Sequence, residues 1–555
     1  MLRREILGIP LGIWLGSVVY ALACIVLRSY YIDYEGLRQI AAVSEGISRA
    51  STTWWSGQSA LGVLLLWLAT LPLRLRLPLV DAAQVVGALS IWASGLILFR
   101  ILRMTGLSVG LCGWLTFLFY GTNVAWVSAT MLPVAALSLL LTAWWGLNAI
   151  RWLAERELDT TYGTRLGVLA GGLGLVNLFA LIPALAVGIL GLRRGGGAGL
   201  LGAAVGVALV GYLVVYFAVL PSTVQVGGAT RPKPSVIEWF WTGEGASAAD
   251  IPRYSGLYWR AMGEQVLNAI LVLARQPFRV RDVYQYYVGG RFSTLIKGLF
   301  VLLALAFVIV LGVIRFSGER VPTDRLVSAV RGVGGLALLL SLIVLVLWQG
   351  DRQAFYLWTL FWALVGLGGW LGSYVEEDVR RMGLAAPALT VVLLVFGLMK
   401  VATLRATAYD TERQEAEAFA PGIRKGDVMV AATRLAEWLR YYSAGRARAI
   451  DAACWLDPET DFQALLQEVQ QATDNNPEEE PKTARIILWG YALDPDPLKR
   501  AGFNANPAWL ESLGKAQELA RNSGGAYRRR YVNMVAYPTL IPLTGEVHTF
   551  GKPRN

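Results

Sequence analysis

Long apolar runs fill most of residues 1–405 and restrict the folds that this chain can adopt. Runs of roughly twenty apolar residues are long enough to cross a bilayer as α-helices. Of the whole chain, 55% is hydrophobic and only 16% is charged, too little charge to cover a soluble protein of this size. The sequence therefore predicts an α-helical polytopic membrane protein, with spanning candidates at 5–27, 82–104, 107–128, 131–153, 165–178, 179–194, 198–220, 293–316, 326–348, 354–374 and 385–404.

The positions of the arginines discriminate between two membrane topologies. The two differ in whether one apolar run, residues 59–72, crosses the membrane. If this run lies in the membrane interface and does not cross, the arginine-bearing ends of the spans all lie on the same side of the membrane. Arginine and lysine are in excess on the cytoplasmic side, so this topology is favoured. These ends carry Arg100, Arg103, Arg151, Arg156, Arg193, Arg194, Arg315, Arg320, Arg325, Arg380 and Arg381. The arrangement predicts about eleven crossings, a cytoplasmic N-terminus on a retained signal anchor, and an extracytoplasmic C-terminus in the cell membrane. It divides 165–194 into two spans around Asn177; a single long helix there would put the C-terminus in the cytoplasm.

Charge and rare residues exclude several functions. The net charge of +11 reflects basic residues at helix ends near lipid phosphate, so it does not indicate nucleic-acid binding. The three cysteines, Cys24, Cys112 and Cys454, have neither disulfide nor metal-site spacing. The one histidine, His548, lies near the C-terminus, which excludes histidine-based catalysis and histidine-rich metal sites.

Three segments are predicted on the outer side, which indicates an extracytoplasmic function. The loop 28–80 carries an amphipathic stretch, 35–50, and the interfacial run 59–72. The loop 221–292 has a stiff basic segment at 230–234 and an amphipathic helix at 256–275, typical of an anchor at the lipid headgroups. The third segment, residues 406–555, is expected to form a soluble α/β domain. Its strands at 426–431, 449–455, 484–489 and 531–537 alternate with helices around 435–439, at 461–472 and at 508–520, which predicts a largely parallel sheet.

Asp33 and Glu35 place two carboxylates where the first span reaches the outer surface, in a region otherwise short of acidic residues. Three roles remain open for them. Asp33 can cap the helix that follows, with Glu35 stabilised in its first turn. The pair can bind a divalent cation, Mg²⁺ or Mn²⁺. Asp33 can also act as the base that takes a proton from an acceptor during sugar transfer.

A phosphate-binding cation completes the chemistry that sugar transfer from a lipid phosphate needs. The phosphate leaves as an anion, so it requires a positive charge more than a general acid. Arg352 lies in the outer connection between two spans and is suited to bidentate phosphate binding. The alternatives are an ordinary interfacial arginine or a partner of the adjacent Asp351.

The order of these features resembles the GT-C membrane glycosyltransferases, of the mannosyltransferase and aminoarabinose-transferase kind, which use polyprenyl-phosphate-linked sugars. The resemblance covers residues 1 to about 405 as an ordered pattern. It rests on the acidic motif 31–36, the interfacial helix 61–71, the Arg-Leu-Pro motif 76–78, the basic end 99–103, and the Arg-Tyr-hydrophobic stretch 352–364. It implies that Asp33 is the base and Glu35 an accessory carboxylate or metal ligand. It also implies that Arg352 and Tyr356 contact the donor phosphate.

Several polar positions of that family pattern are missing. Residues 128–133 hold no acidic side chain where members often carry a second one, and residues 56–59 lack the frequent His-Pro pair. Asn177 stands where a histidine or arginine is often found. The leading expectation is a glycosyltransferase that moves a sugar from a polyprenyl-phosphate donor to an extracytoplasmic lipid, glycan or protein. The alternative is a catalytically inactive GT-C-like scaffold subunit that contacts membrane lipids and other subunits of a complex.

Overall fold

The structure is a computed structural model of the whole chain. It describes residues 5–6, 8–56, 59–226, 229–236, 239, 289–347, 353–404, 410–423, 425, 427–431, 433–451, 486–488, 531–532 and 535–536. Contacts within the chain divide it into two compact units. The helical unit comprises Met1–Ile32, Gln58–Val214 and Pro252–Ala406, and the mixed unit comprises Asp33–Gly57, Val215–Ile251 and Thr407–Asn555.

The helical unit follows the apolar pattern of the sequence closely. A short hairpin of β1 (Glu5–Ile6) and β2 (Ile9–Pro10) precedes the first helix. The helices are α1 (Leu11–Val26), α3 (Gly62–Arg74), α4 (Leu79–Arg103), α5 (Val109–Gly121), α6 (Asn123–Met131), α7 (Pro133–Ala154), α8 (Thr160–Val176), the 3₁₀ turn η1 (Leu178–Ala180), α9 (Leu181–Leu192), α10 (Gly197–Val214), α14 (Gly289–Ser317), α15 (Arg325–Leu347), α16 (Gln353–Leu371), α17 (Glu376–Val379) and α18 (Met382–Leu404).

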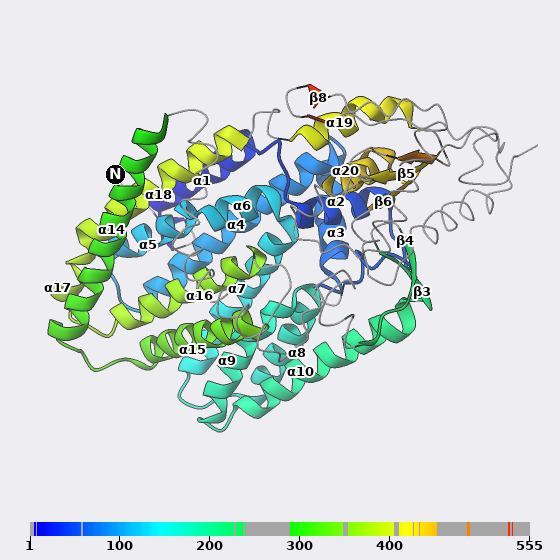
Figure 1. Cartoon of the computed structure of the whole chain (residues 1–555). Helices are drawn as coiled ribbons and strands as arrows, with labels where there is room; N and C mark the ends of the chain where they lie inside the picture. The colour runs from blue at the N-terminus through cyan, green and yellow to red at the C-terminus, as the bar shows by residue number, and fades with distance from the viewer. Residues whose placement is uncertain are drawn as a thin grey trace, which may run out of the picture. The chain divides into compact units, whose positions relative to one another are not determined.

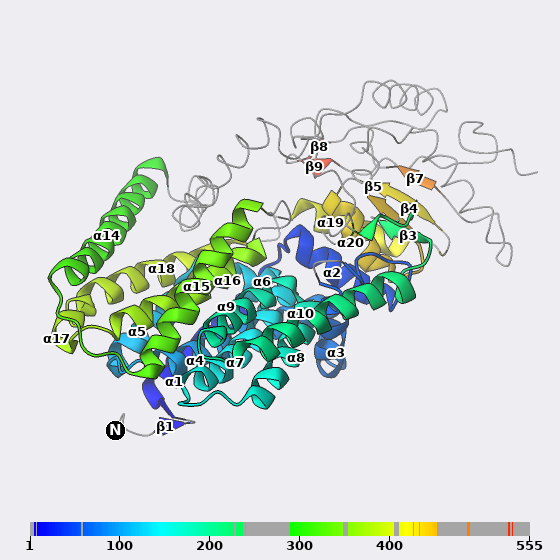
Figure 2. The same ribbon diagram turned by 90° about the horizontal axis from the view of Figure 1, so that it is seen from below.

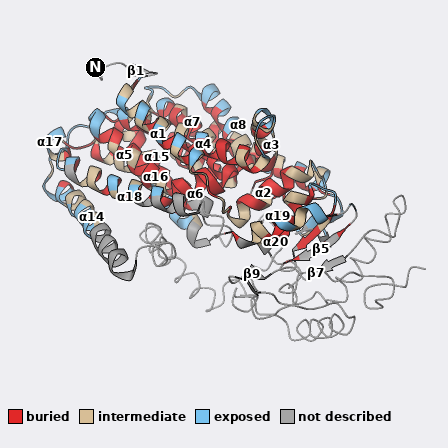
Figure 3. Cartoon of the chain, turned by 90° about the horizontal axis from the view of Figure 1, so that it is seen from above, coloured by how far each residue is buried: buried red, intermediate tan, exposed pale blue. Residues whose placement is uncertain are grey.

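Within the described residues, four helices are long and apolar enough to cross a membrane. They are Leu79–Arg103, Pro133–Ala154, Gly197–Val219 and Arg325–Val344. Large apolar side chains also lie exposed on the outside of the helical unit, as Leu209 and Val210 do on α10 and Val308 and Ile309 on α14. Figure 3 shows exposed, pale blue segments on α14. In water such surfaces are unfavourable, whereas lipid tails accept them. These helices support a membrane protein; the predicted number of crossings and the sidedness of the termini stay predictions.

Small residues set the distances between the helices of this unit. α10 lies along α8, and α15 lies along α16 (Figures 1 and 2). At the first of these pairs, a Cβ on Gly167 would lie 2.3 Å from the backbone oxygen of Leu200. Backbone cannot move aside as a flexible side chain can, so glycine at this position is what lets the two helices approach so closely.

Replacing Gly167 by alanine is expected to destabilise the α8–α10 pair by about 1–3 kcal/mol, since the added methyl group forces the helix backbones apart. Gly172 on the same helix is the matched control, because a Cβ there would meet nothing within 4 Å. Gly172→Ala should be neutral or stabilising by about 0.5–1 kcal/mol. Thermal unfolding of the detergent-solubilised chain measures both, and equal midpoints for the two variants would contradict the close approach.

The helix ends confirm the predicted break in 165–194 and differ from the prediction in 5–27 and in 107–128. In the first of these runs the helix α1 begins only at Leu11, after the hairpin. The run 165–194 is indeed broken: α8 ends at Val176, and the Asn177 side chain accepts a hydrogen bond from the Phe179 N–H at 3.0 Å. The run 107–128, predicted as one span, is instead two helices. Thr122 stops α5 and starts α6, because its hydroxyl donates to the Phe119 carbonyl and accepts from the Ala125 N–H.

The mixed unit joins one helix from the segment Asp33–Gly57 to a small α/β assembly. Its elements are α2 (Tyr34–Glu45), the π-helical segment η2 (Val215–Val219), β3 (Thr223–Val226), β4 (Ala229–Pro232), α19 (Thr411–Phe419), the 3₁₀ turn η5 (Ala420–Gly422), β5 (Val428–Ala431), α20 (Thr433–Ser443), β6 (Arg448–Asp451), β7 (Ile486–Leu488), β8 (Tyr531–Val532) and β9 (Val535–Ala536). Helix α2 packs against α20. The predicted stretch 35–50 ends early, at Gly46, whose φ of +87° is a left-handed conformation that stops a helix.

The sheet is parallel, as the alternation of strands and helices predicts. Its strand order is β6-β5-β7, with β5 pairing in parallel with both neighbours. The stretch 531–537, predicted as one strand, holds the two strands β8 and β9, which pair antiparallel. The stiff segment 230–234 is extended where it forms β4, paired with β3. The predicted helices 256–275, 461–472 and 508–520 lie outside the described residues, and the domain boundary near residue 406 stays a prediction.

Candidate functional site

The chain ahead of the acidic pair is fixed to the helical unit by three side chains. Arg28 binds Asp81 with two nitrogens, each 2.9 Å from a carboxylate oxygen. The buried Gln84 amide donates to the Ser29 carbonyl at 2.8 Å and to the Thr130 carbonyl at 2.9 Å. A buried amide that satisfies two backbone carbonyls holds its neighbours in a single arrangement. The end of α1 is therefore tied to α4 and α6.

Asp33 occupies the N-cap position of α2, with an extended backbone at φ −65° and ψ 152°. Its backbone carbonyl accepts the Leu37 N–H at 2.9 Å, which closes the first helical turn. Of the three roles left open for Asp33, the side-chain cap is not formed, since its carboxylate accepts no hydrogen bond from the first-turn N–H groups of α2. The helix N-terminus still favours a negative charge at this position, because the peptide dipoles are aligned there. Asp33 is half-buried.

Glu35 lies in the first turn of α2 and is bound by its own helix. Its carboxylate forms an ion pair with Arg38 at 3.0 Å and accepts a hydrogen bond from the Gln39 amide at 2.9 Å. Both partners follow at the spacings that bring side chains together on a helix surface. Glu35 thus has a compensated charge and a fixed orientation.

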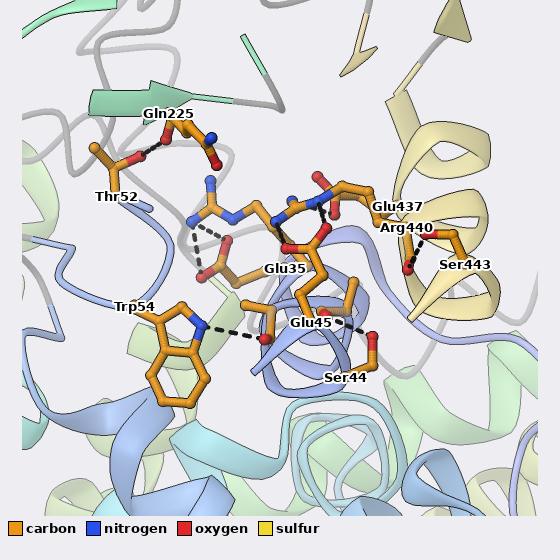
Figure 4. A network of polar contacts seen from close by, with 12 residues as sticks. Glu35, Ser44, Glu45, Thr52, Trp54, Gln225, Glu437, Arg440 and Ser443 are labelled. Carbon is orange, nitrogen blue, oxygen red and sulfur yellow. Dashed lines mark hydrogen bonds and ion pairs between the residues drawn. The ribbon is translucent and has the colours of Figure 1, made fainter. Parts of the chain in front are cut away.

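Arg440 connects the other end of α2 to α20 (Figure 4). Its guanidinium binds both oxygens of Glu45, at 2.9 and 2.7 Å, and donates to Glu437 at 2.7 Å. The side chain of Arg440 is 5% exposed and that of Glu437 is fully buried. The bidentate geometry makes the hydrogen bonds of this pair strong, and burial makes the loss of any one partner costly.

Tryptophans fix the loop that follows α2. The Trp54 indole donates to the Ala42 carbonyl at 3.1 Å, and Trp55 donates to Ser48 at 3.0 Å. Trp239, distant in the sequence, donates to the Trp55 carbonyl at 2.9 Å. Beside them the Thr52 hydroxyl donates to the Gln225 carbonyl of β3 (Figure 4). These contacts give α2 a rigid support within the mixed unit.

A second set of charges joins α19 to α20. Asp410 caps α19 by accepting the Arg413 N–H at 3.0 Å and also binds Arg434. Burial raises the pKa of Asp410, and the charge of Arg434 opposes this shift only in part. Burial likewise raises the pKa of Tyr442, whose hydroxyl donates to Glu417. Both groups serve the packing of these helices.

The structure brings together two of the four residues predicted for the site. Asp33 and Glu35 lie in the same turn at the start of α2. Tyr356 belongs to the helical unit, where it is buried in α16. Arg352 lies outside the described residues.

The predicted divalent cation lacks a suitable donor set in the part of the chain that the structure describes. No cluster of three or more His, Cys, Asp or Glu side chains with the geometry of a metal site occurs there. Glu35 already neutralises Arg38, so it is a poor ligand for Mg²⁺ or Mn²⁺, which prefer several anionic oxygens. These residues do not fit a metal, and no metal-dependent step follows from them.

Sequence reasoning missed the residues that position α2. Arg38 and Gln39 could have been found, because they follow Glu35 at helical spacing. Arg440 gave no such signal, since 395 residues separate it from Glu45. Gln84 is an amide within a mostly apolar helix, and polar residues at such positions indicate internal hydrogen bonding.

Comparisons with known proteins give few matches. No family model matches the chain, and no curated protein sequence is significantly similar to it. Among solved structures, the crystal structure of ArnT from Cupriavidus metallidurans bound to undecaprenyl phosphate is similar, with a TM-score of 0.40, 10% identity, and coverage of 89% of this chain and 94% of that one. The apo crystal structure of the same protein gives a TM-score of 0.40, 12% identity, and coverage of 88% and 93%.

Proposed function

We propose that this chain is a GT-C-type membrane glycosyltransferase that transfers a sugar from a polyprenyl-phosphate-linked donor to an extracytoplasmic acceptor. One observation carries the proposal. The apolar helix α1 is followed by Asp33 at the head of the amphipathic helix α2, then by the apolar helix α3 and the long apolar helix α4. This is the order of elements on which the sequence resemblance rests.

Asp33 is assigned as the base in this reaction. An acceptor oxygen attacks the anomeric carbon of the donor sugar while the bond from that carbon to the phosphate oxygen breaks. The bonding electrons leave with the phosphate, and the acceptor proton passes to the Asp33 carboxylate. Glu35 orients the start of α2 through Arg38 and Gln39 and thereby acts as an accessory residue. Arg352 and Tyr356 keep the role predicted from the sequence, contact with the donor phosphate.

The alternative is an inactive GT-C-like subunit of a membrane complex, and one observation favours it. Asn177 stands where members of the resembled GT-C family often carry a histidine or an arginine, and its side chain accepts the Phe179 N–H. A capping role of this kind is structural. Under this alternative the mixed unit would supply contacts to partner subunits.

Donor turnover by the purified full chain separates these functions. The chain is incubated in detergent with a set of polyprenyl-phosphate sugars and total membrane lipid as acceptor, and release of free polyprenyl phosphate is measured. A transferase consumes at least one donor at a rate that depends on the acceptor. Absence of turnover for every donor and acceptor fraction, together with copurification of other subunits in fixed ratio, would favour the scaffold.

A further inference from the structure

Helix α2, with Asp33 at its head, belongs to the mixed unit and packs there against α20. Leu37, Ile40 and Ala41 have no exposed surface, and their spacing places them on one face of α2. Leu439 of α20 is fully buried as well. The proposed base therefore lies on a helix that forms part of the core of the mixed unit.

The far end of α2 is fixed to α20 by a side-chain contact and a backbone contact. Both carboxylate oxygens of Glu45 accept hydrogen bonds from the Arg440 guanidinium, at 2.9 and 2.7 Å (Figure 4). A Cβ on Gly445, just after α20, would lie 3.6 Å from the Glu45 carbonyl oxygen, so the backbone also lies close to the end of α2. A bidentate pair restrains orientation as well as distance.

Arg440 has a second carboxylate partner on its own helix. Its guanidinium donates to Glu437 at 2.7 Å, and the two side chains are 5% and 0% exposed. Removal of the Glu45 carboxylate therefore leaves the charge of Arg440 compensated, and the large penalty of an unpaired buried charge does not arise. A substitution at Glu45 tests the connection between the two helices separately from the burial of charge.

A helix transmits a restraint from one end to the other because it is stiff. α2 is 12 residues long, and at 1.5 Å per residue Asp33 and Glu45 are about 18 Å apart along the axis. A tilt of about 3° at one end of such a helix moves the other end by about 1 Å. A misplacement of about 1 Å can lower turnover about 10²-fold. The ion pair at Glu45 is therefore able to control the position of Asp33.

We propose that Glu45 and Arg440 are positioning residues for sugar transfer, which hold Asp33 in its reacting position by fixing α2 to α20. The inference rests on the proposed function, since it takes Asp33 as the base. It makes the α/β assembly of the mixed unit a regulator of the reaction, because displacement of α20 also displaces the base.

Glu45→Ala and Glu412→Ala form a matched pair of variants in the detergent-purified full chain. Glu412 is 31% exposed, against 25% for Glu45, and binds Arg434 of α20 at 2.8 Å, but it belongs to α19. Arg434 keeps a second carboxylate, that of Asp410. The two variants remove similar ion pairs from the same helix, and the pair lost in Glu45→Ala is the one that holds α2.

Hydrogen exchange of the α2 amides and donor turnover measure the effect. In Glu45→Ala, exchange in peptides that cover α2 should become about tenfold faster, because hydrogen bonds between charged groups are strong. The kcat for release of polyprenyl phosphate should fall about tenfold or more, with a nearly constant KM for the donor. Glu45→Gln retains an oxygen acceptor for Arg440 and should keep more of the turnover. Glu412→Ala should change neither exchange of α2 nor kcat.

The outcomes separate this inference from the proposed function. Turnover by the unaltered chain with equal α2 exchange in Glu45→Ala and Glu412→Ala would refute the inference and leave the proposed function intact. Faster α2 exchange in Glu45→Ala without a loss of kcat would also refute the positioning role. Absence of turnover in the unaltered chain would refute the proposed function and the positioning role with it, and the exchange comparison would still establish whether Glu45 fixes α2.

Discussion

Asp33→Asn is expected to lower sugar transfer by about 10²- to 10⁴-fold, because an amide cannot take the acceptor proton in the transition state. The change preserves size and the N-cap preference of the position, so the fold should persist. Donor binding should change little, since the base acts on the acceptor. The expected signature is therefore a fall in kcat with a nearly constant KM for the donor, measured as release of polyprenyl phosphate.

Asp159→Asn is the matched control for this variant. Asp159 is also an N-cap aspartate, but at an exposed position before α8, where its carboxylate accepts the N–H groups of Thr161 and Tyr162. Asparagine keeps this capping oxygen, so turnover should stay near that of the unaltered chain. If Asp33→Asn and Asp159→Asn turn over donor equally well, Asp33 is not the base.

Arg440→Met is expected to destabilise the mixed unit by about 3–5 kcal/mol, because it leaves the buried Glu437 carboxylate and the partly buried Glu45 carboxylate without their shared cation. Methionine keeps much of the apolar stem of arginine, so the loss reports the charge more than the packing. Since the ion pair joins α2 to α20, the start of α2 should loosen as well. Thermal unfolding of the full chain in detergent, followed by tryptophan fluorescence, measures the effect.

Two further variants show whether the buried charges cause this loss. Arg446→Met changes an exposed arginine whose guanidinium, among the described residues, donates to the Ser443 and Tyr442 carbonyls. Its effect should stay within about 0.5 kcal/mol. Changing Glu45 and Glu437 to glutamine in the Arg440→Met background removes the uncompensated charges and should recover most of the lost stability. A triple variant as unstable as Arg440→Met would refute the electrostatic explanation.

Apolar periodicity and length made the helices of the first unit predictable. A bilayer-spanning helix satisfies its own backbone and needs only a long apolar run, so the local sequence contains most of the necessary information. The prediction failed where one hydroxyl decides the backbone path, as Thr122 does between α5 and α6. The parallel pairing of β5 with β6 and β7 followed from the alternation of strands and helices, since parallel strands require crossover connections. The order β6-β5-β7 itself came only from the structure.

The candidate site was also predictable from the sequence only in part. By itself the sequence determined a helical membrane protein and drew attention to Asp33 and Glu35, because acidic residues are scarce beside apolar spans. Only the tertiary structure decided that Glu35 is bound by Arg38 and Gln39 and that Arg440 connects Glu45 to Glu437. The physical reason is range: helix formation depends on neighbours three or four residues apart, whereas the Arg440–Glu45 ion pair joins positions 395 residues apart. Such contacts depend on packing, which local pattern does not encode.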